Sequence, residues 1–454
     1  MVHMSKEMYS STANVLEKAI EKIRTESREF STFEASILAY DGAIITASRL
    51  PCVVGSLCAV KSVNGDQVTG EVVRIKQRSI EIIPHDLRFP FQIGDKVILS
   101  QIHQTVHVGE PLLGRVVDGL GMPLDRETLP ECQVHYPLDG KPLNPFERLE
   151  IREVLDVGIQ NLNALNTIGC GQRIGIVAGS GVGKSVLLSM ITKYAAADII
   201  VVALIGERGR EVATFAKEIL SSESKSRSVI IAVPADRSPL LRIQGAKRAT
   251  AVAEYFRDQG KNVLLIMDSL TRVAHAQREV GLSLGEQPTS RGYTPSVISL
   301  LPTLIERTGT SAKSAGSITS IYTVLADGDD VTSDPVVDIS RAILDGHIVL
   351  TRELSQQGIY PAIDATKSIS RLMNDIVSPE HRENAVKLKR LISKYYANHD
   401  LVMMGGYVNG QDQDLDTALR LWPQIERFLK QDYAQTVSFD QSVSQLNDLV
   451  GQMS

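Results

Sequence analysis

The chain has few aromatic residues and few cysteines. Aromatic side chains make up 5% of its 454 residues, with a single tryptophan, so aliphatic side chains are expected to dominate the core. Its four cysteines are scattered, without a CxxC pair or a Cys/His cluster. This distribution argues against a zinc site and against a disulfide framework.

Long apolar runs and an excess of positive charge are also missing. No apolar run is long enough to span a bilayer, and the N-terminus lacks the apolar segment of a signal peptide, which favours a cytosolic protein. Acidic residues outnumber basic ones, 53 against 48, for a net charge of −5. Nucleic-acid-binding domains are usually basic, so we expect no nucleic-acid partner.

The length and the changing pattern along the chain predict several domains. Residues 1–32 contain an amphipathic stretch over 12–30, a helix expected either to pack on the chain's own body or to bind a regulatory partner. Residues 33–105 carry short β-like runs separated by glycine and proline, which predict a small β-barrel. Within them, Asn64-Gly65 indicates a hairpin with a two-residue turn.

Residues 106–378 alternate apolar strands with helical stretches, which predicts an α/β domain with a mainly parallel sheet covered on both faces. The expected strands are "RIGIVA", "IIVVALIG", "SVIIAV", "NVLLIMD", "ITSIYTVLA" and "HIVLT". Residues 379–454 are predicted to be mainly α-helical. The predicted fold is therefore multidomain, with an N-terminal β-barrel, a central α/β domain and C-terminal helices.

A glycine-rich string, "AGSGVGKS", follows an apolar strand and precedes a helical stretch, the setting in which such loops bind phosphate. Gly179, Gly181 and Gly183 allow the backbone to curl so that its N–H groups point at phosphate oxygens. The following helix adds the positive end of its dipole. Lys184 is placed to reach the β- and γ-phosphates, and Ser185 to bind Mg²⁺.

Acidic residues follow two other apolar strands. Asp268, at the end of "NVLLIMD", is expected to hold Mg²⁺ through water. Glu207, after "IIVVALIG", is the candidate base that polarises an attacking water, and Arg208 is placed to bind the γ-phosphate. A solvated charged loop is the alternative for this second segment.

These strings resemble the RecA-like catalytic subunits of the rotary ATPase superfamily. Within it the chain is most similar to the type III export ATPases, the flagellar protein export ATPases in particular. The matching strings occur in the family's order over about residues 108–410: "VGEPLLGRVVDGLGMPLD", "GQRIGIVAGSGVGKSVLL", "LIGERGREV", "PADRSP", "MDSLTRVAHAQRE", "GYTPSV", "SDPVVDISRAILDGHIVLTREL", "GIYPAID" and "SISR".

The resemblance implies a P-loop ATPase with ATP as substrate and Mg²⁺ as cofactor. Glu207 is implied to be the catalytic carboxylate, supported by Arg208, and the metal is implied to bind to Ser185, Asp268 and Glu211. The implied nucleotide-binding residues of the loop are Gly179, Ser180, Gly181, Val182, Gly183, Lys184, Ser185 and Val186.

Three further roles are carried over from the family alone. Arg272, in "DSLTR", is implied to sense the γ-phosphate within its own subunit. Tyr360, in "GIYPAID", is implied to stack on the adenine ring. Arg371, in "SISR", is implied to be an arginine finger that reaches into the neighbouring subunit's site, which requires a homohexameric ring.

By resemblance, the ring hydrolyses ATP to energise type III protein export, and the "AGSGVGKS" and "LTRVAHAQRE" strings favour a flagellar system. It is implied to be cytoplasmic, peripherally attached to the inner face of the cytoplasmic membrane. The implied partners are a regulatory protein on the N-terminal helix, the membrane proteins of the export gate, a stalk protein in the ring and chaperone–cargo complexes.

Three alternatives remain at the level of sequence. An injectisome ATPase would share these motifs. A non-catalytic subunit of a rotary ring usually has glutamine where this chain has Glu207. A hexameric nucleic-acid motor needs basic loops at its pore, and the segment Gly281–Thr294 carries only Glu286 and Arg291 as charges, so a polypeptide fits that pore better.

Overall fold

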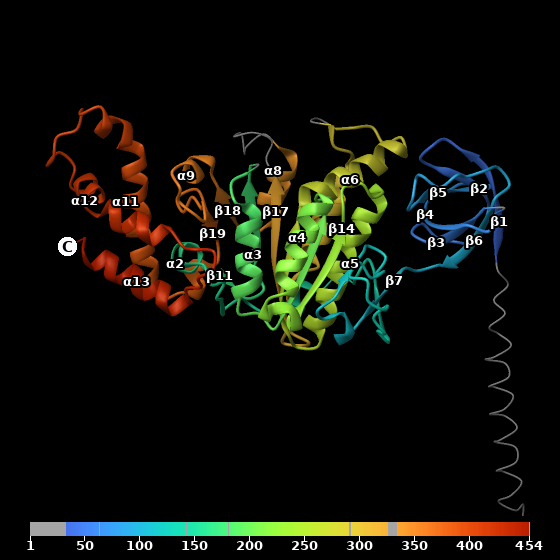
Figure 1. Cartoon of the computed structure of the whole chain (residues 1–454), viewed down its shortest axis with the longest axis horizontal. Helices are drawn as coiled ribbons and strands as arrows, with labels where there is room; N and C mark the ends of the chain where they lie inside the picture. The colour runs from blue at the N-terminus through green and yellow to red at the C-terminus, as the bar shows by residue number, and fades with distance from the viewer. Residues whose placement is uncertain are drawn as a thin grey trace, which may run out of the picture. The chain divides into compact units, whose positions relative to one another are not determined.

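A computed structural model describes residues 33–62, 64–141, 143–179, 181–289, 292–325 and 334–453 (Figure 1). The chain divides into two compact units, Met1–Gln104 and Thr105–Ser454, and each is described by itself. The predicted helix at 12–30 and the loop residue Ser180 lie outside the described residues.

The first unit contains a closed barrel in the strand order β1-β2-β5-β4-β3-β6. Alternate side chains of these strands point inward and form a small aliphatic core that includes Ile37, Ile45 and Val60. The predicted β-barrel is confirmed. Its strands are β1 (Glu34–Tyr40), β2 (Ile45–Ser48), β3 (Leu57–Lys61), β4 (Gln67–Ile75), β5 (Ser79–Pro84) and β6 (Lys96–Gln101).

The hairpin predicted at Asn64-Gly65 exists, but its two-residue turn is wrong. The ladder of β3 and β4 extends one pair beyond Lys61 and Gln67, since the Ser62 N–H donates to the Asp66 carbonyl at 2.9 Å. More than the two residues Asn64-Gly65 therefore connect the ladder, and Gly65 has a φ of +89°.

The second unit is built on a central sheet whose strands follow the order β8-β14-β13-β15-β17-β12-β18-β19. All are parallel except the short β19 at one edge, and β16 (Gly309–Thr310) pairs antiparallel with β17. All six predicted strands are present. The bounds are β8 (Val116–Val117), β12 (Arg173–Ala178), β13 (Ile199–Ile205), β14 (Ser228–Val233), β15 (Asn262–Asp268), β17 (Ser317–Leu325), β18 (Gly346–Leu350) and β19 (Ile369–Ser370).

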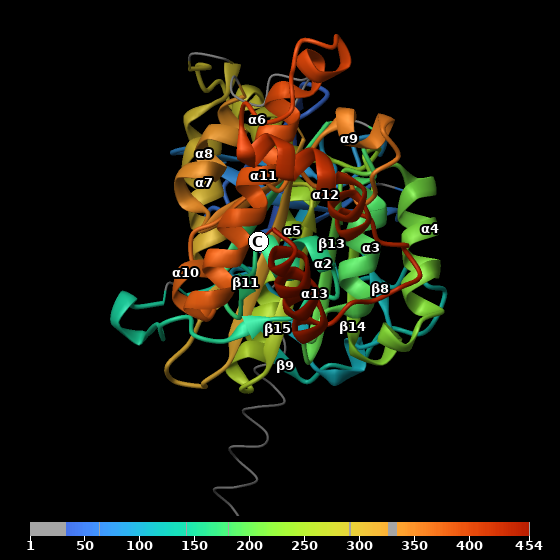
Figure 2. The ribbon, with the colours of Figure 1, turned by 90° about the vertical axis from the view of Figure 1, so that its left-hand side faces the viewer.

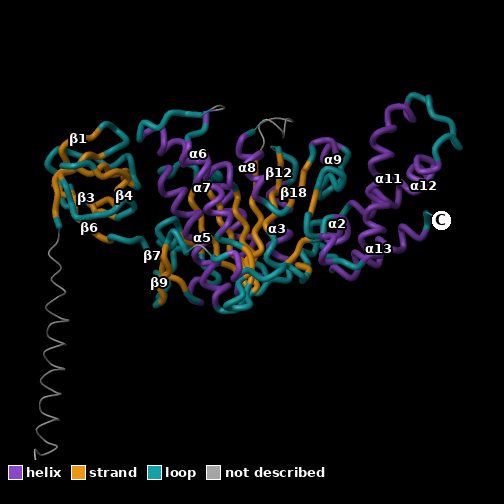
Figure 3. The backbone as a smooth tube through the Cα atoms, turned by 180° about the vertical axis from the view of Figure 1, so that it is seen from behind, coloured by secondary structure: helices purple, strands orange, loops and turns teal. Residues whose placement is uncertain are grey.

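Helices cover both faces of this sheet, as Figures 1 and 3 show from opposite sides. Along β13, Ile200 and Val202 pack toward one helical layer, while Val201 and Ala203 pack toward the other. The first layer contains α3 (Lys184–Tyr194) and α4 (Gly209–Leu220). The second contains α5 (Pro239–Asp258), α6 (Leu270–Ser283), α7 (Pro295–Glu306) and α8 (Pro335–Ile343).

The chain ends in three helices that pack with α2 (Gln160–Leu165) around a core of their own (Figure 2). They are α11 (Pro379–Met403), α12 (Gln413–Leu429) and α13 (Phe439–Gly451), as the predicted helical C-terminus requires. Tyr395 of α11 stacks on Trp422 of α12, with ring centroids 3.5 Å apart. The predicted multidomain fold class is confirmed.

Short elements complete the second unit. They are β7 (Thr105–Val108), which pairs with β9 (Val134–Pro137), β10 (Val154–Leu155), which pairs with β11 (Ile168–Gly169), α9 (Arg352–Gln356) and α10 (Met373–Ile376). Across the described ranges, no helix combines the length and the apolar character needed to cross a membrane.

Candidate active site

The carboxyl ends of three strands of the central sheet bring the predicted residues together. The glycine-rich loop leaves β12 after Ala178, Glu207 follows β13, and Asp268 is the last residue of β15. Asp268 pairs in register with Leu204, near the end of β13. Because parallel strands end at the same edge of a sheet, these groups share one edge, the usual position of a ligand site in such folds.

The loop owes its curvature to two glycines. Gly181 and Gly183 have φ values of +79° and +91°, a region that other residues rarely adopt. Gly183 is the N-cap of α3, so Lys184 and Ser185 lie in the first turn of that helix. The N–H groups of this turn have no partner within the helix and point toward the end of the loop, where an anion would bind.

Lys184 joins two carboxylates across this edge. Its Nζ forms an ion pair with Asp268 Oδ1 and lies 3.4 Å from Glu207 Oε1. All three side chains are nearly buried. Thr323 of β17 donates a hydrogen bond from Oγ1 to Asp268 Oδ1 at 2.6 Å, which fixes the orientation of that carboxylate. A phosphate group arriving at the loop would compete with the carboxylates for the ammonium.

The surroundings of Glu207 make its carboxylate a stronger base. Burial raises the pKa of Glu207 above its usual value, and the negative charge of Asp268 raises it further. Lys184 opposes both effects through its charge and its contact with Glu207 Oε1. A carboxylate with a raised pKa accepts a proton from water more readily, which is what a general base requires.

A cavity of about 530 Å³ opens beside these groups between α3 and α4. Its lining includes Ser185, Glu207, Glu211 and Asp268. The described part of the chain contains no cluster of His, Cys, Asp or Glu that could hold a metal by itself. Mg²⁺ usually takes one or two protein oxygens together with phosphates and waters, so a hydroxyl and a carboxylate on this cavity fit that ion.

A second cavity, of about 810 Å³, lies on the other side of α3 and contains Tyr360. The Tyr360 ring approaches the loop closely, 3.7 Å from where a Cβ on Gly183 would be. Its hydroxyl is 2.8 Å from Ser355 Oγ, and 47% of the residue is exposed. Val186 and Tyr433 line both cavities. The ring thus borders both the loop and the larger cavity, and its stacking on adenine stays a prediction.

Replacing Tyr360 with alanine is expected to raise the KM for ATP about 10-fold and to leave kcat nearly unchanged, because stacking of an aromatic ring on a base contributes about 1–3 kcal/mol to binding. Steady-state kinetics measures both constants. Tyr360→Phe is the matched control, since it keeps the ring and removes only the contact with Ser355. An unchanged KM in the alanine variant would refute the stacking role.

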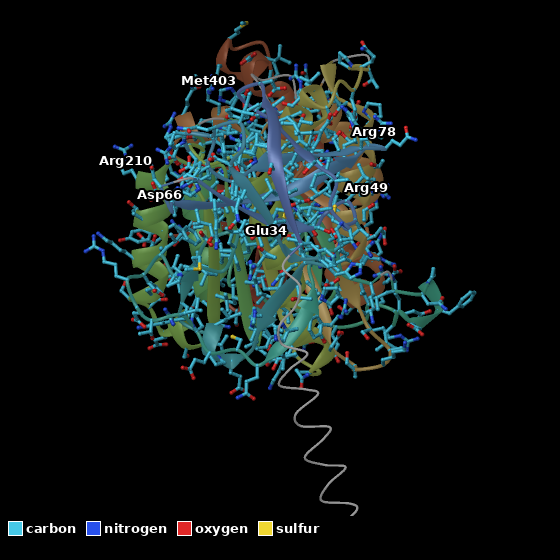
Figure 4. All side chains as sticks on the ribbon, turned by 90° about the vertical axis from the view of Figure 1, so that its right-hand side faces the viewer. Glu34, Arg49, Asp66, Arg78, Arg210 and Met403 are labelled. Carbon is cyan, nitrogen blue, oxygen red and sulfur yellow. The ribbon has the colours of Figure 1, made fainter. Side chains whose placement is uncertain are left out.

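Two of the predicted arginines, Arg208 and Arg272, form no hydrogen bond or ion pair, among the described residues, with Lys184 or its two carboxylate partners. The Arg208 side chain is 81% exposed and bonds to Glu211 Oε1 at 3.3 Å. Arg272 packs against Gly206, where an added Cβ would come within 2.8 Å of the arginine Cβ. Neither arginine lines the two cavities, whereas Arg210 lines the smaller one and projects outward from α4 (Figure 4). The phosphate-binding roles of Arg208 and Arg272 stay predictions.

Arg371 lies near the amino ends of the parallel strands, opposite the end where the phosphate loop begins. It follows β19, whose Ser370 pairs with Gly346 at the amino end of β18, whereas Ala178 pairs with Leu350 at the carboxyl end of β18. The four residue steps between these pairs span about 13 Å along the strand. Arg371 Nη2 donates to the carbonyl of Arg341 at 3.1 Å. Arg371 therefore does not reach the phosphate loop of its own chain.

Sequence reasoning missed two contributions to this site. Thr323, which orients Asp268, stands inside the apolar run "SIYTVL", and a lone hydroxyl in such a run was the only signal. The C-terminal helical region lines the larger cavity, and nothing in its sequence pattern indicated that. Its lining residues are Pro423, Glu426, Arg427, Lys430, Gln431, Asp432, Tyr433 and Gln435.

Two family models match consecutive parts of the chain. Residues 158–370 match the nucleotide-binding domain of the ATP synthase alpha/beta family. Residues 377–448 match the C-terminal domain of the T3SS EscN ATPase. The first range contains the loop and the candidate residues Lys184, Glu207 and Asp268, and the second contains the helices that line the larger cavity.

Among curated proteins, the chain is similar to flagellum-specific ATP synthases. It is 45% identical to that of Pseudomonas aeruginosa over 420 residues, covering 92% of this chain and 93% of that protein. It is 46% identical to that of Salmonella typhimurium over 416 residues, covering 89% and 91%.

Among solved structures, the assembled ATPase EscN of the type III secretion system of enteropathogenic E. coli matches with a TM-score of 0.86 at 42% identity, covering 92% of this chain and 100% of that chain. The same ATPase in complex with its central stalk EscO matches with a TM-score of 0.84 at 40% identity, with the same coverage.

Proposed function

This chain belongs to the flagellum-specific ATP synthase family, and we propose that it works as a homohexameric, Mg²⁺-dependent ring in which each ATP site is completed by the neighbouring subunit. It is a P-loop ATPase of the type III export class, and the names of its curated relatives favour the flagellar system over the injectisome. One observation carries the ring proposal: Lys184, Glu207 and Asp268 meet at one sheet edge, while Arg371 lies at the other.

In the proposed mechanism, the first event is an exchange of partners at Lys184. The β- and γ-phosphates of ATP bind to the N–H groups of the loop and draw the Lys184 ammonium away from Asp268 and Glu207. Because the charge of Lys184 lowers the pKa of Glu207, its departure makes that carboxylate a stronger base. Substrate binding thus activates the group that handles water.

Hydrolysis then needs a positioned water and compensation of charge. Glu207 accepts a hydrogen bond from the water and takes its proton as the oxygen attacks the γ-phosphorus in line with the leaving β-phosphate oxygen. Ser185 and Asp268, held by Thr323, would hold Mg²⁺. When bound, that ion offsets negative charge on the phosphates. Glu211 lines the same cavity and is proposed to bind waters of that ion.

Arg371 is proposed to supply the remaining positive charge from the next subunit. Such arginine fingers change phosphoryl-transfer rates by about 10³–10⁵-fold, or about 4–7 kcal/mol. A site completed in trans requires head-to-tail contacts, which close into a ring when the rotation between subunits is right.

Further partners are proposed by family likeness. EscN, which the chain resembles, assembles with a central stalk, and we propose a stalk protein for this ring as well. Export-gate membrane proteins and chaperone–cargo complexes are proposed at a cytoplasmic ring held to the inner face of the cytoplasmic membrane. A regulatory protein is proposed on residues 1–32, and deleting those residues should abolish its binding while hydrolysis survives.

The ATPase rate per subunit, measured against protein concentration, tests the ring. We expect the rate to rise cooperatively as subunits assemble, because an isolated chain lacks the arginine finger. The oligomeric state should be followed in the same samples by mass photometry. A rate per subunit that stays constant from the monomeric to the assembled range would contradict the proposal.

A further inference from the structure

The second unit exposes an unusual apolar side chain on a short 3-10 turn, Pro145–Glu147. Phe146 in this turn is 97% exposed. Two other apolar side chains, Leu149 and Ile369, are 47% and 49% exposed. Isolated exposed apolar residues are common on protein surfaces, and Phe146 is the most exposed large apolar residue in the described part of the chain. We call Phe146 and Leu149, which lie three residues apart on one segment, the Phe146 patch.

The turn that carries Phe146 is firmly braced. Asn144 Oδ1 accepts a hydrogen bond from the Phe146 N–H at 3.1 Å. Glu147 Oε1 pairs with Lys313 Nζ at 2.9 Å, and Arg148 Nη1 donates to the Thr308 carbonyl at 2.7 Å. The backbone on both sides of the ring is therefore fixed, so that binding a partner there would cost little ordering entropy.

The patch lies along the same side of the domain as Arg371. A Cβ on Gly169 would lie 2.5 Å from Ile151 Cγ2 and 3.3 Å from Ile376 Cδ1, so the segment after Leu149 runs beside α10, which follows Arg371. Figure 2 shows the loop leading into β10 on the side of α10. Ile369 itself is two residues from Arg371, on β19.

The patch is also attached to the layer of helices that does not carry the phosphate loop. Glu306 is the last residue of α7, and its Oε2 pairs with Arg148 Nη2 at 3.2 Å. The helix α7 lies in the layer of α5–α8, whereas the loop helix α3 lies in the opposite layer with α4. Arg371 also belongs to this side, since its Nη2 donates to the carbonyl of Arg341 on α8, in the same layer as α7. A head-to-tail contact that brings Arg371 to a neighbour's loop would therefore bring this side of the domain against that neighbour.

We propose that the Phe146 patch is a docking surface for a second copy of this chain and seats Arg371 at the neighbour's ATP site. This inference rests on the ring proposed above and names the apolar contact that holds it together. The Arg371 side chain is exposed in the free chain, and removing its guanidinium from water costs free energy. Burial of the apolar Phe146 ring supplies a driving force for association that the arginine alone lacks.

The test is the assembly of full-length Phe146→Ser, followed by mass photometry over a range of protein concentrations in the presence of Mg²⁺ and a non-hydrolysable ATP analogue. We expect its assembly midpoint to move to a concentration about 10-fold or more above that of the wild type. The ATPase rate per subunit should fall at low concentration and recover at high concentration, with the KM for ATP unchanged. Phe146→Leu should stay near the wild type.

Met404→Ser is the matched control, because Met404 is 84% exposed at the far end of α11 and is expected to leave assembly unchanged. Since Phe146 packs against little of its own chain, both variants should unfold at the wild-type temperature. Assembly of Phe146→Ser at the wild-type midpoint would overturn the docking surface and leave the ring intact. A wild type that never assembles would instead overturn the ring, and the docking surface with it.

Discussion

Replacing Arg371 with alanine is expected to lower the ATPase rate of the assembled protein about 10³–10⁵-fold. The reason is that its guanidinium is proposed to compensate charge that develops on the transferring phosphoryl group, so its loss leaves that charge less stabilised. Ser370, beside it, and Ala178, where its own phosphate loop begins, pair with β18 at positions about 13 Å apart along that strand, so its loss is expected to act on the neighbour's site. Rates should be measured at saturating ATP and at a concentration where the ring is assembled.

The control for this prediction is Arg78→Ala, which removes an exposed arginine of the β-barrel (Figure 4). It should keep the wild-type rate. Binding of a fluorescent ATP analogue should survive in Arg371→Ala, because the loop and Tyr360 belong to the subunit that binds it. A variant that retains a tenth or more of the wild-type rate would exclude a finger role for Arg371.

Replacing Glu207 with glutamine is expected to lower kcat about 10²–10⁴-fold while ATP still binds. The amide keeps the shape of the side chain but cannot accept a proton from water. Single-turnover hydrolysis and nucleotide binding, measured separately, distinguish loss of chemistry from loss of affinity. Glu279→Gln is the matched control, since Glu279 pairs with Arg242 and lines neither of the two cavities described above.

The same carboxylate sets a pH dependence. As the proposed base, Glu207 must be ionised to accept a proton, so the rate should fall as the pH is lowered through its pKa. Because burial and Asp268 raise that pKa, this acid limb should lie above the range of an ordinary glutamate. An acid limb at the ordinary glutamate range, or near-normal hydrolysis by Glu207→Gln, would remove Glu207 from the role of base.

Much of the catalytic edge was predictable from the sequence because parallel strands impose a simple rule. Continuous apolar runs predicted β12, β13 and β15, and the polar residue that ends or follows such a run must lie at the carboxyl edge. That rule places Lys184, Glu207 and Asp268 together, and the structure joins them through ion pairs. Local pattern alone was sufficient here.

Other features depend on contacts that local pattern does not encode. The loop after β3 is longer than Asn64-Gly65 suggested. The strand register, set across the barrel, places Ser62 opposite Asp66, and more than two residues lie between them. Thr323 reaches Asp268 only because β17 lies beside β15. The lining supplied by residues 423–435 depends on how the C-terminal helices dock, a tertiary arrangement. The roles of Tyr360 and Arg371 came from family resemblance alone.

The most direct test of a site shared between subunits is to mix Glu207→Gln and Arg371→Ala subunits in equal amounts, let them assemble together and measure the ATPase rate. In random mixed rings, half of the subunits keep Glu207, and half of their neighbours supply Arg371, so about a quarter of the wild-type rate should return. Neither variant alone should show it. A mixture as inactive as its two components would mean that Glu207 and Arg371 must act within one chain, which contradicts the account.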